Sequence, residues 1–418
     1  MNNVASYDLK ITCSGCGMCS YICPQHAIEI KLIDGGYYPV IDKHLCNGCG
    51  KCVKVCPGLY RDWDNLNKSV FGGIPEDIYI GNYCNIFYGY ATNTEIRYSS
   101  SSGGMVTGLL VYMLKQKFID GAIVTKFIFE DNTIRAKAFI ATTEKEVLDS
   151  RGSKYCPVDF HNALNEIRHF TGKLAVVCLP CHAISLRKAM LIDKNLSSKI
   201  EYIFSLFCGR TPLHFALDTF LKEQKVNGHI TDLYIRGNGW PGKTVVWTDR
   251  NDKMIVAYLK VWRSFLGKDI FLPLSCYCCY DFLGEFADIS FGDAWIPQCK
   301  NDNTGSSVFI IRTSKADDVI KKAKEDNIIT MRPLSTNVLK TSFFTNLFTK
   351  KNNARIHELI TKHPFPVRDS KKISNINVFS FIYESIRFLE IRNRRYNNLL
   401  LNKIKNFSFN RCKKKIKL

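Results

Sequence analysis

Residues 13–57 read CSGCGMCSYICPQHAIEIKLIDGGYYPVIDKHLCNGCGKCVKVCP, and this stretch decides how the rest of the chain is interpreted. The spacing C-x2-C-x2-C-x3-C-P occurs in it twice, and each copy ends in a proline, Pro24 or Pro57. Its cysteines are Cys13, Cys16, Cys19 and Cys23 in the first copy and Cys46, Cys49, Cys52 and Cys56 in the second. Glycines at positions 15, 17, 48 and 50 let the backbone bend around a bulky group that a side chain would hit. The stretch therefore has the pattern of a ligand set for an inorganic cofactor.

The repeated run is the one that bacterial-type ferredoxins use to bind two [4Fe-4S] clusters. In such proteins the fourth cysteine of each run crosses over to the other cluster. We therefore expect a first set of ligands, Cys13, Cys16, Cys19 and Cys56, and a second set, Cys46, Cys49, Cys52 and Cys23. The alternative is a zinc site or a disulfide knot, but zinc commonly takes two CxxC pairs, which leaves the prolines and the duplicated spacing unexplained.

The totals describe a globular protein with room for two or three domains. The chain has 418 residues, of which 46% are hydrophobic. Eighteen cysteines and no signal peptide in residues 1–10 indicate a reducing compartment, so we expect a cytoplasmic protein. No apolar run reaches the roughly 18 residues of a membrane span, which leaves a soluble or membrane-peripheral protein.

A strong positive charge favours anionic partners. The formal net charge is +20, from 58 basic and 38 acidic side chains, and much of it lies in residues 387–417, where Glu390 is the only acid. We expect a helical basic tail over residues 341–418 that contacts an anionic membrane or an acidic partner; a solvated charged tail is the alternative. Because no nucleic-acid-binding motif accompanies the charge, no nucleic-acid partner is expected.

Local patterns divide the chain into three parts. Two short strands, residues 28–33 and 37–41, flank a hairpin turn at Asp34 and complete an α+β ferredoxin module over residues 1–62. The segment 59–75 is polar and contains glycine, so we place the domain boundary there. An α/β domain with a mixed, mostly parallel sheet is expected over residues 76–340, because strand-like and helix-like segments alternate.

The alternation is clearest between residues 99 and 224. Helices are expected from 103 to 117, from the capping box Thr143–Glu146, and over 159–170, 182–191 and 212–224. Strands are expected over 122–129, 134–141, 174–178, 200–207, 232–236, 244–248, 255–259, 288–291 and 308–312.

A further group of cysteines falls at the ends of predicted strands. Cys181 follows one strand and Cys208 ends the next, so both thiols would lie at the carboxyl edge of the sheet if these strands are parallel neighbours. With the CxxC pair Cys276 and Cys279 they form a third set of four thiolates, the number that another cubane needs. Two alternatives remain open here: Cys178 is a buried structural thiol, or Cys178 and Cys181 form a thioredoxin-type redox pair.

Seven short motifs, in this order, resemble the family of beta subunits of coenzyme F-420-reducing hydrogenases and dehydrogenases. They are SSSGG at 100–104, RGSKY at 151–155, LPC at 179–181, FCG at 207–209, GW at 239–240, SCxxC at 275–279 and DISFGDAW at 288–295. The resemblance covers about residues 1–300. It implies a further [4Fe-4S] cluster on the third set and an FAD in the α/β part, and Cys278 leaves the fourth ligand of that cluster open by one position.

The resemblance also implies which residues contact the FAD: Ser101, Ser102, Gly103, Gly104, Gly152, Ser153, Lys154 and Tyr155. Ser102 can cap a helix whose first amides face an anion, and the glycines let a diphosphate approach the backbone. Lys154 would place a positive charge near the reduced flavin.

These observations together predict an iron–sulfur flavoprotein oxidoreductase. Clusters pass single electrons and hydride donors deliver two, and a flavin joins the two regimes. The expected partners are ferredoxin or another redox protein and a small-molecule substrate. That substrate is coenzyme F-420 or another compound, for instance in cell-surface polysaccharide synthesis, a role associated with bacterial proteins that the chain also resembles. The alternative is a non-catalytic electron-relay subunit of a larger complex. No catalytic residue is assigned.

Overall fold

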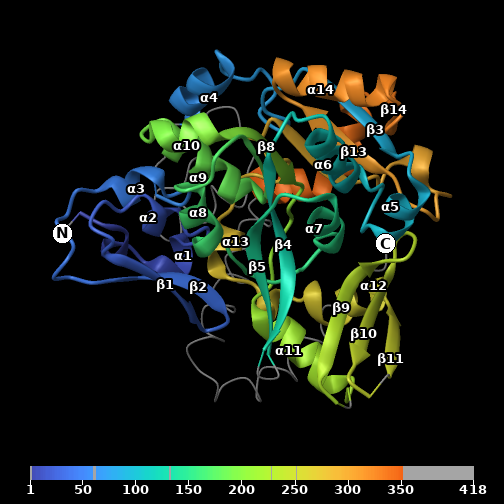
Figure 1. The fold of residues 1–418 in the computed structure, drawn as a ribbon, viewed down its shortest axis with the longest axis horizontal. Coiled ribbons are helices and arrows are strands. Elements are labelled where there is room, and N and C mark those ends of the chain that lie inside the picture. Colours follow the sequence, from blue (N-terminus) through green and yellow to red (C-terminus); the bar gives the residue numbers. More distant parts are fainter. Residues whose placement is uncertain (1, 60–62, 131–132, 227, 251, 352–418) are drawn as a thin grey trace, which may run out of the picture.

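A nine-stranded mixed sheet forms the centre of the molecule (Figure 1). The computed structural model describes residues 2–59, 63–130, 133–226, 228–250 and 252–351. In spatial order the strands are β14 (Ile329–Pro333), β3 (Asn85–Ala91), β13 (Ser307–Ile311), β12 (Ile289–Asp293), β8 (Ile200–Leu206), β7 (Leu174–Cys178), β4 (Gly121–Glu130), β5 (Thr133–Ala141) and β6 (Val158–Asp159).

Parallel pairing is confined to part of this sheet. β12, β8, β7 and β4 run parallel to one another, and β6 runs parallel to β5. The pairs β4–β5, β12–β13, β13–β3 and β3–β14 are antiparallel. The predicted mixed α/β sheet is confirmed, whereas the expected predominance of parallel pairs holds only for its centre. β7 and β8 are parallel neighbours, so the segments after them meet at one carboxyl edge, as the sequence predicts.

Helices cover both faces of the sheet, which gives three layers. The labelled α-helices of this part are α5 (Thr94–Ser99), α6 (Met105–Lys115), α7 (Glu144–Asp149), α8 (His161–Ile167), α9 (Pro180–Met190), α10 (Lys194–Lys199), α11 (His214–Glu223), α12 (Tyr258–Val261), α13 (Leu274–Tyr277), α14 (Ser314–Glu325) and α15 (Thr336–Ser342). Residues 344–351 are also helical. Short helical turns of other types are η2 (Trp262–Leu266), η3 (Asp269–Phe271) and η4 (Pro297–Cys299).

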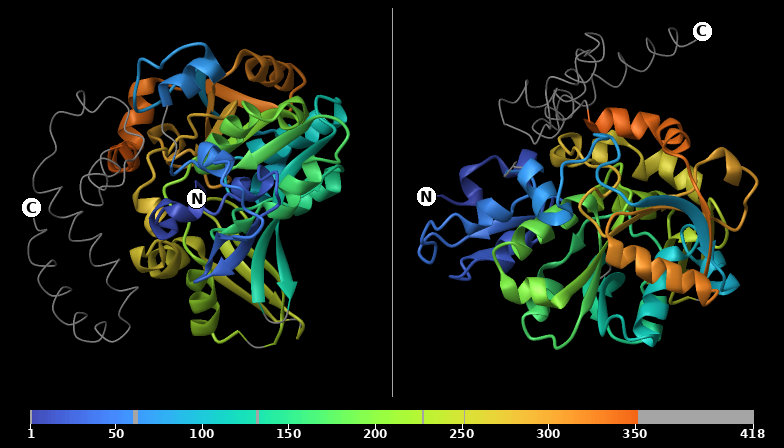
Figure 2. Two further views of the ribbon diagram at one scale, coloured as in Figure 1. Left: turned by 90° about the vertical axis from the view of Figure 1, so that its left-hand side faces the viewer. Right: turned by 90° about the horizontal axis from the view of Figure 1, so that it is seen from above.

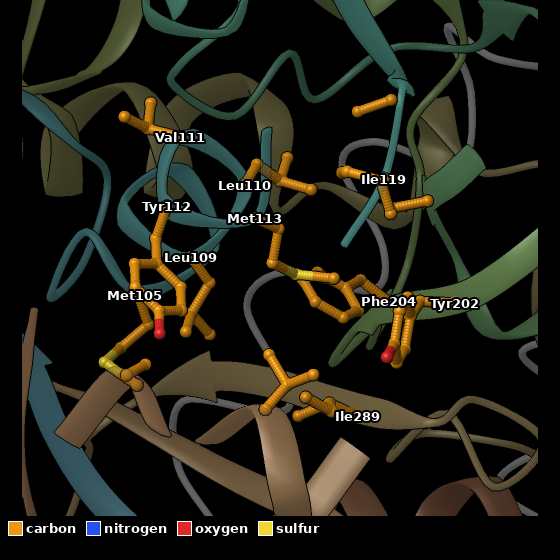
Figure 3. Packing of buried hydrophobic residues seen from close by; sticks show 14 of the residues in the cluster. Met105, Leu109, Leu110, Val111, Tyr112, Met113, Ile119, Tyr202, Phe204 and Ile289 are labelled. Carbon is orange, nitrogen blue, oxygen red and sulfur yellow. The ribbon is translucent and has the colours of Figure 1, made fainter. Parts of the chain in front are cut away.

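Alternate residues of each central strand pack on opposite faces. On β8, Phe204 packs with α6, α7 and α14, while Ile203 packs with α8, α9 and α10. Met113 of α6 lies against Phe204, and Ile289 of β12 closes the same cluster (Figure 3). Apolar side chains on both faces explain why the central strands read as continuous hydrophobic runs.

The cysteine-rich stretch folds as a small module at one side of the sheet. It contains η1 (Val4–Ser6), α1 (Leu9–Thr12), α2 (Met18–Tyr21), α3 (Lys51–Val55) and the predicted hairpin of β1 (Ile28–Ile33) and β2 (Gly36–Ile41). Met18 and Tyr21 share a buried cluster with α8 and α9, and the Tyr21 hydroxyl donates to Asp193 at 3.0 Å. Both views in Figure 2 show the module, in dark blue, beside the green helices.

The region after the module is not only a linker. Residues 63–71 form α4 (Trp63–Phe71), and Trp63 is buried against Tyr280 and Phe286. The predicted strands near 230–259 form a separate three-stranded sheet of β9 (Ile230–Gly237), β10 (Lys243–Thr248) and β11 (Lys253–Ala257) beside β4. No helix among the described residues is both long and apolar enough to span a membrane. Most of the predicted basic tail, residues 352–418, lies outside the described residues.

Candidate functional site

The two copies of the cysteine run have the same local structure. A glycine in the left-handed region, Gly17 with φ 74° or Gly50 with φ 70°, precedes a short helix, α2 or α3, that carries the third cysteine. A side chain is disfavoured at such a φ, so these glycines let the chain fold back around the cysteines. The duplication in sequence is therefore a duplication in shape.

Cys56 lies with the first three cysteines. Burial raises the pKa of the Cys13 thiol, and the neighbouring thiols of Cys16 and Cys56 raise it further. Burial likewise raises the pKa of Cys19, with Cys16, Cys13 and Cys56 adding to the effect. These four side chains lie near one another, as a crossed arrangement of ligands would require.

Cys23 lies with the second copy. With Cys46, Cys49 and Cys52 it lines a small separate cavity, and the Asn3 amide lies 3.4 Å from the Cys46 sulfur. Cys49 is exposed, so the second set reaches the protein surface. Within the described residues, no three His, Cys, Asp or Glu side chains are placed to hold a single metal ion. The four cysteines of the second set are arranged around the small cavity rather than around one point.

The third set converges at the carboxyl edge of the sheet. Cys181 lies in the first turn of α9, directly after β7, and Cys208 lies two residues after β8. Cys276 is in α13 and Cys279 follows it. Burial raises the pKa of Cys181, and the thiols of Cys279, Cys208 and Cys276 raise it further, so the four sulfurs are electrostatic neighbours.

The two cysteines that competed for these roles lie differently. Cys278 also lines the cavity, but it packs with Ile11 and Leu272 in a hydrophobic cluster, and its neighbours are Cys279, Cys276 and Lys350 rather than Cys181 or Cys208. Cys178 is buried in the cluster beneath α8 and α9. The geometry thus favours Cys276 and Cys279 over Cys278, and a buried structural thiol over a redox pair for Cys178.

The first and third sets are adjacent. Cys16 of the first set is among the thiols that raise the pKa of Cys181. Cys13 and all four cysteines of the third set line one cavity of about 770 Å³. The second set, which reaches the surface at Cys49, the first set and the third set therefore follow one another toward this cavity.

The predicted cofactor-binding segments line the other part of the cavity. Ser101, Ser102, Gly104 and residues 152–155 are on its wall. Ser101 joins the segments, since its hydroxyl accepts from the Ser153 amide at 2.8 Å and donates to the Arg236 carbonyl at 3.1 Å. Gly103 is not on the wall. A Cβ there would lie 2.7 Å from the Gly89 oxygen, so this glycine allows close packing against β3.

One expectation about a single residue is wrong, and Lys154 makes contacts that the sequence did not indicate. Ser102 does not cap α6: its hydroxyl donates to the Ser306 carbonyl at 2.7 Å, and the N-cap is Gly104, which has no side-chain acceptor. The Lys154 ammonium turns back to its own loop and donates to the carbonyls of residues 150, 151 and 152 at 3.0–3.1 Å. Burial lowers the pKa of Lys154 to about 8. Lys154 thus fixes the loop that lines the cavity.

Several polar groups beside these segments lack protein partners. The α6 N-terminus faces the cavity without a side-chain cap, and the Ser100 hydroxyl and the Arg236 Nη2 atom are buried without a hydrogen-bond partner. Arg236 is held by Asp293, whose carboxylate lies 2.6 Å from Nη1. Asp293 lies in the motif 288–295 that carries part of the family resemblance, and no sequence signal assigned a role to Arg236.

The fold and the cysteine sets define a class of protein. Residues 12–58 match the family of 4Fe-4S dicluster domains, so the chain is an iron–sulfur redox protein. Residues 86–165 match the N-terminal part of the beta subunit of coenzyme F420 hydrogenase/dehydrogenase, and residues 171–337 match its C-terminal part. The chain therefore belongs to the family of coenzyme F420 hydrogenase/dehydrogenase beta subunits.

Three relatives whose names mention coenzyme F420 come from Methanosarcina and Methanocaldococcus species. The beta subunit of the coenzyme F420 hydrogenase of Methanosarcina barkeri is 28% identical over 266 residues, 62% of this chain and 85% of that protein. A subunit of the F(420)H(2) dehydrogenase of Methanosarcina mazei is 27% identical over 306 residues, 71% of this chain and 78% of that protein. The coenzyme F420-dependent sulfite reductase of Methanocaldococcus jannaschii is 29% identical over 238 residues, 53% of this chain and 34% of that protein.

A solved structure shares the fold. A chain of the F420-reducing [NiFe] hydrogenase complex from Methanosarcina barkeri superposes with a TM-score of 0.55 at 24% identity. The match covers 71% of this chain and 99% of that chain.

Proposed function

We propose that the chain is an iron–sulfur flavoprotein oxidoreductase that moves electrons between a one-electron redox protein, such as ferredoxin, and a two-electron organic substrate. The observation that carries this proposal is the shared cavity, because the third cysteine set and the loops at 100–104 and 151–155 lie on its wall. Its volume of about 770 Å³ lies in the range of roughly 300–1,000 Å³ that small-molecule sites occupy.

The three cysteine sets supply the one-electron side. We propose that each holds a [4Fe-4S] cluster, two in a ferredoxin domain over residues 1–62 and one in an α/β domain over residues 76–340. The cysteines of the first and third sets are half-buried, which fits clusters partly shielded from water, and the exposed Cys49 fits contact with a protein partner.

The residues beside the loops fit FAD. A flavin nucleotide carries a diphosphate, which the uncapped amides of α6 can bind because a helix N-terminus favours anions. The unpartnered Ser100 hydroxyl and Arg236 Nη2 atom offer two further donors. When bound, the flavin supplies the exchange between one-electron and two-electron chemistry. Ser101 holds the two loops together and Lys154 fixes the loop at 150–154, so both shape its site.

Relatives that act with coenzyme F420 make this deazaflavin the first substrate to test. A small molecule of cell-surface polysaccharide synthesis is the second, and the electron-relay subunit is the alternative function. In the relay function, no organic molecule exchanges electrons with the protein.

Quantification of iron, sulfide and flavin in anaerobically purified protein tests the proposal. We expect about twelve irons, four for each cubane, and about one FAD per chain. About eight irons with full flavin would contradict the third cluster. Absence of flavin from protein with about twelve irons would contradict the flavoprotein and favour the relay.

A further inference from the structure

A buried lysine lies directly against the third cysteine set. Lys350 is on a helix over residues 344–351, beyond residues 171–337 that match the family. Its ammonium donates to the carbonyl oxygen of Cys276 at 3.2 Å, and the side chain lines the same cavity as the four cysteines. Only 6% of the residue is exposed. The positive charge is therefore placed where water screens it little.

The charged neighbours of Lys350 are the thiols themselves. Its Nζ atom lies 3.2 Å from the carbonyl oxygen of Cys276, and its side chain shares the cavity wall with Cys208 and Cys279. Among the ion pairs of the described residues, none gives Lys350 a carboxylate partner. The charge is thus free to act on whatever the cysteines bind.

The next residue fixes this lysine in place. Lys351 is buried, forms an ion pair with Glu285, and lies 3.6 Å from the centre of the Tyr280 ring. Removing one partner of such a buried pair is strongly destabilising, so the helical segment that contains Lys350 and Lys351 is held firmly. Lys350 therefore does not swing away from the cysteines as a surface lysine would.

We propose that the Lys350 ammonium raises the reduction potential of the cluster held by the third set. An electron added to a cluster adds one negative charge, which a fixed cation in a poorly screened position stabilises. The inference rests on the proposed third cluster. It makes Lys350 a tuning residue that favours electron transfer from the first set into the third.

The first set has a comparable lysine. Lys188 of α9 is 7% exposed and donates to the Cys56 carbonyl at 2.8 Å. Its charge therefore acts on the first set, and Lys188→Gln should lower the potential of a module cluster instead. This variant serves as the matched control for Lys350→Gln.

The test is a redox titration of the anaerobic full-length protein, followed by electron paramagnetic resonance. Wild type, Lys350→Gln, Lys350→Arg and Lys188→Gln are compared, and the third-set signal is identified as the one lost in Cys208→Ser. We expect Lys350→Gln to weaken reduction of the third cluster about tenfold, which is about 59 mV for one electron. Lys350→Arg should restore the wild-type value, and the module signals should not move in either variant.

An unchanged third-set potential in Lys350→Gln, with the cluster present, would overturn the inference and leave the proposed function intact. A wild-type protein without the third-set signal would instead overturn the proposed function. If the Lys350→Gln protein does not retain the cluster, the Asn346→Asp variant is titrated in its place. Asn346 lines the same cavity one helical turn from Lys350, and a carboxylate there should lower the potential. No change in that variant would also overturn the inference.

Discussion

At the scale of single residues, Cys208 is a proposed cluster ligand, whereas Cys278 is a buried thiol that we do not assign to the cluster. Cys208→Ser should reduce the iron content from about twelve to about eight per chain, because one cubane loses a ligand. Cys278→Ser should keep about twelve, because Cys278 packs in a hydrophobic cluster and does not neighbour Cys181 or Cys208. Iron analysis and the visible spectrum of both anaerobic proteins check this. Equal iron loss in the two variants would remove the distinction.

The role of a residue was predictable from the sequence where its spacing from other residues, or its place after a strand, indicates the chemistry. The eight module cysteines follow from a fixed local run, and Cys181 and Cys208 follow from their place after two strands. Arg236 and Lys350 were not predictable, since a single charged residue has no spacing signal and both reach the cavity only through tertiary packing. Lys154 was predicted on the cavity, but its hydrogen bonds to its own loop could not be foreseen.

At the scale of elements, the loop before α6 depends on Gly103. A Cβ at this position would lie 2.7 Å from the Gly89 oxygen and 2.8 Å from the Ser307 nitrogen, both in the backbone. Gly103→Ala should therefore cost about 1–3 kcal/mol of unfolding free energy and lower the flavin content. Gly73→Ala is the control, because a Cβ there meets nothing within 4 Å. Anaerobic urea unfolding measures both, and similar stability losses would contradict the packing argument.

The contact between the β1–β2 hairpin and α11 should be sensitive to acid. His214 begins α11, its amide donates to the Gly35 carbonyl at 3.0 Å, and its ring lies edge-on to Tyr37. Burial lowers the pKa of His214 to about 4, and Arg135 adds to the effect. In the unfolded chain the His214 side chain has a pKa of about 6.5, so as the pH falls it takes up its proton before the folded protein does. The contribution of His214 to the free energy of unfolding is thus fully present above about pH 6.5 and is lost as the pH falls toward 4.

His214→Phe should remove this loss. Between pH 7 and pH 5 the wild type should lose about 2 kcal/mol more unfolding free energy than the variant, since only the wild type has this proton to bind. The exposed His44→Gln should behave as the wild type does. Equal pH dependence in His214→Phe and the wild type would contradict the assignment.

The elements of the central sheet were predictable in part. Strands β7 and β8 read as buried apolar runs next to helical patterns, and both were expected at nearly their observed bounds. β3 and β14 were not expected. β3 pairs with β13 and β14, more than 200 residues away, and local periodicity does not reveal such pairing. β14 also ends at Pro333, which weakens its strand signal.

At the scale of the whole molecule, the order of the three cysteine sets gives the proposal its direction. The second set reaches the surface through Cys49, the first set lies beside Cys181, and the third set opens into the cavity with the loop residues. The module shares a buried cluster with α8 and α9, so the first and third sets are held at a fixed separation. An electron from a protein partner thus has an ordered series of sites that leads to the proposed flavin site.

The rate at which reduced ferredoxin reduces the bound flavin tests the central claim most directly. Stopped-flow spectra are recorded for anaerobic wild type, Cys278→Ser and Cys208→Ser, each with its flavin content verified. We expect flavin reduction in the wild type and in Cys278→Ser, and a loss of at least about a hundredfold in Cys208→Ser, while its module clusters still become reduced. Flavin reduction at the wild-type rate in a Cys208→Ser protein that lacks the third cluster would contradict the account.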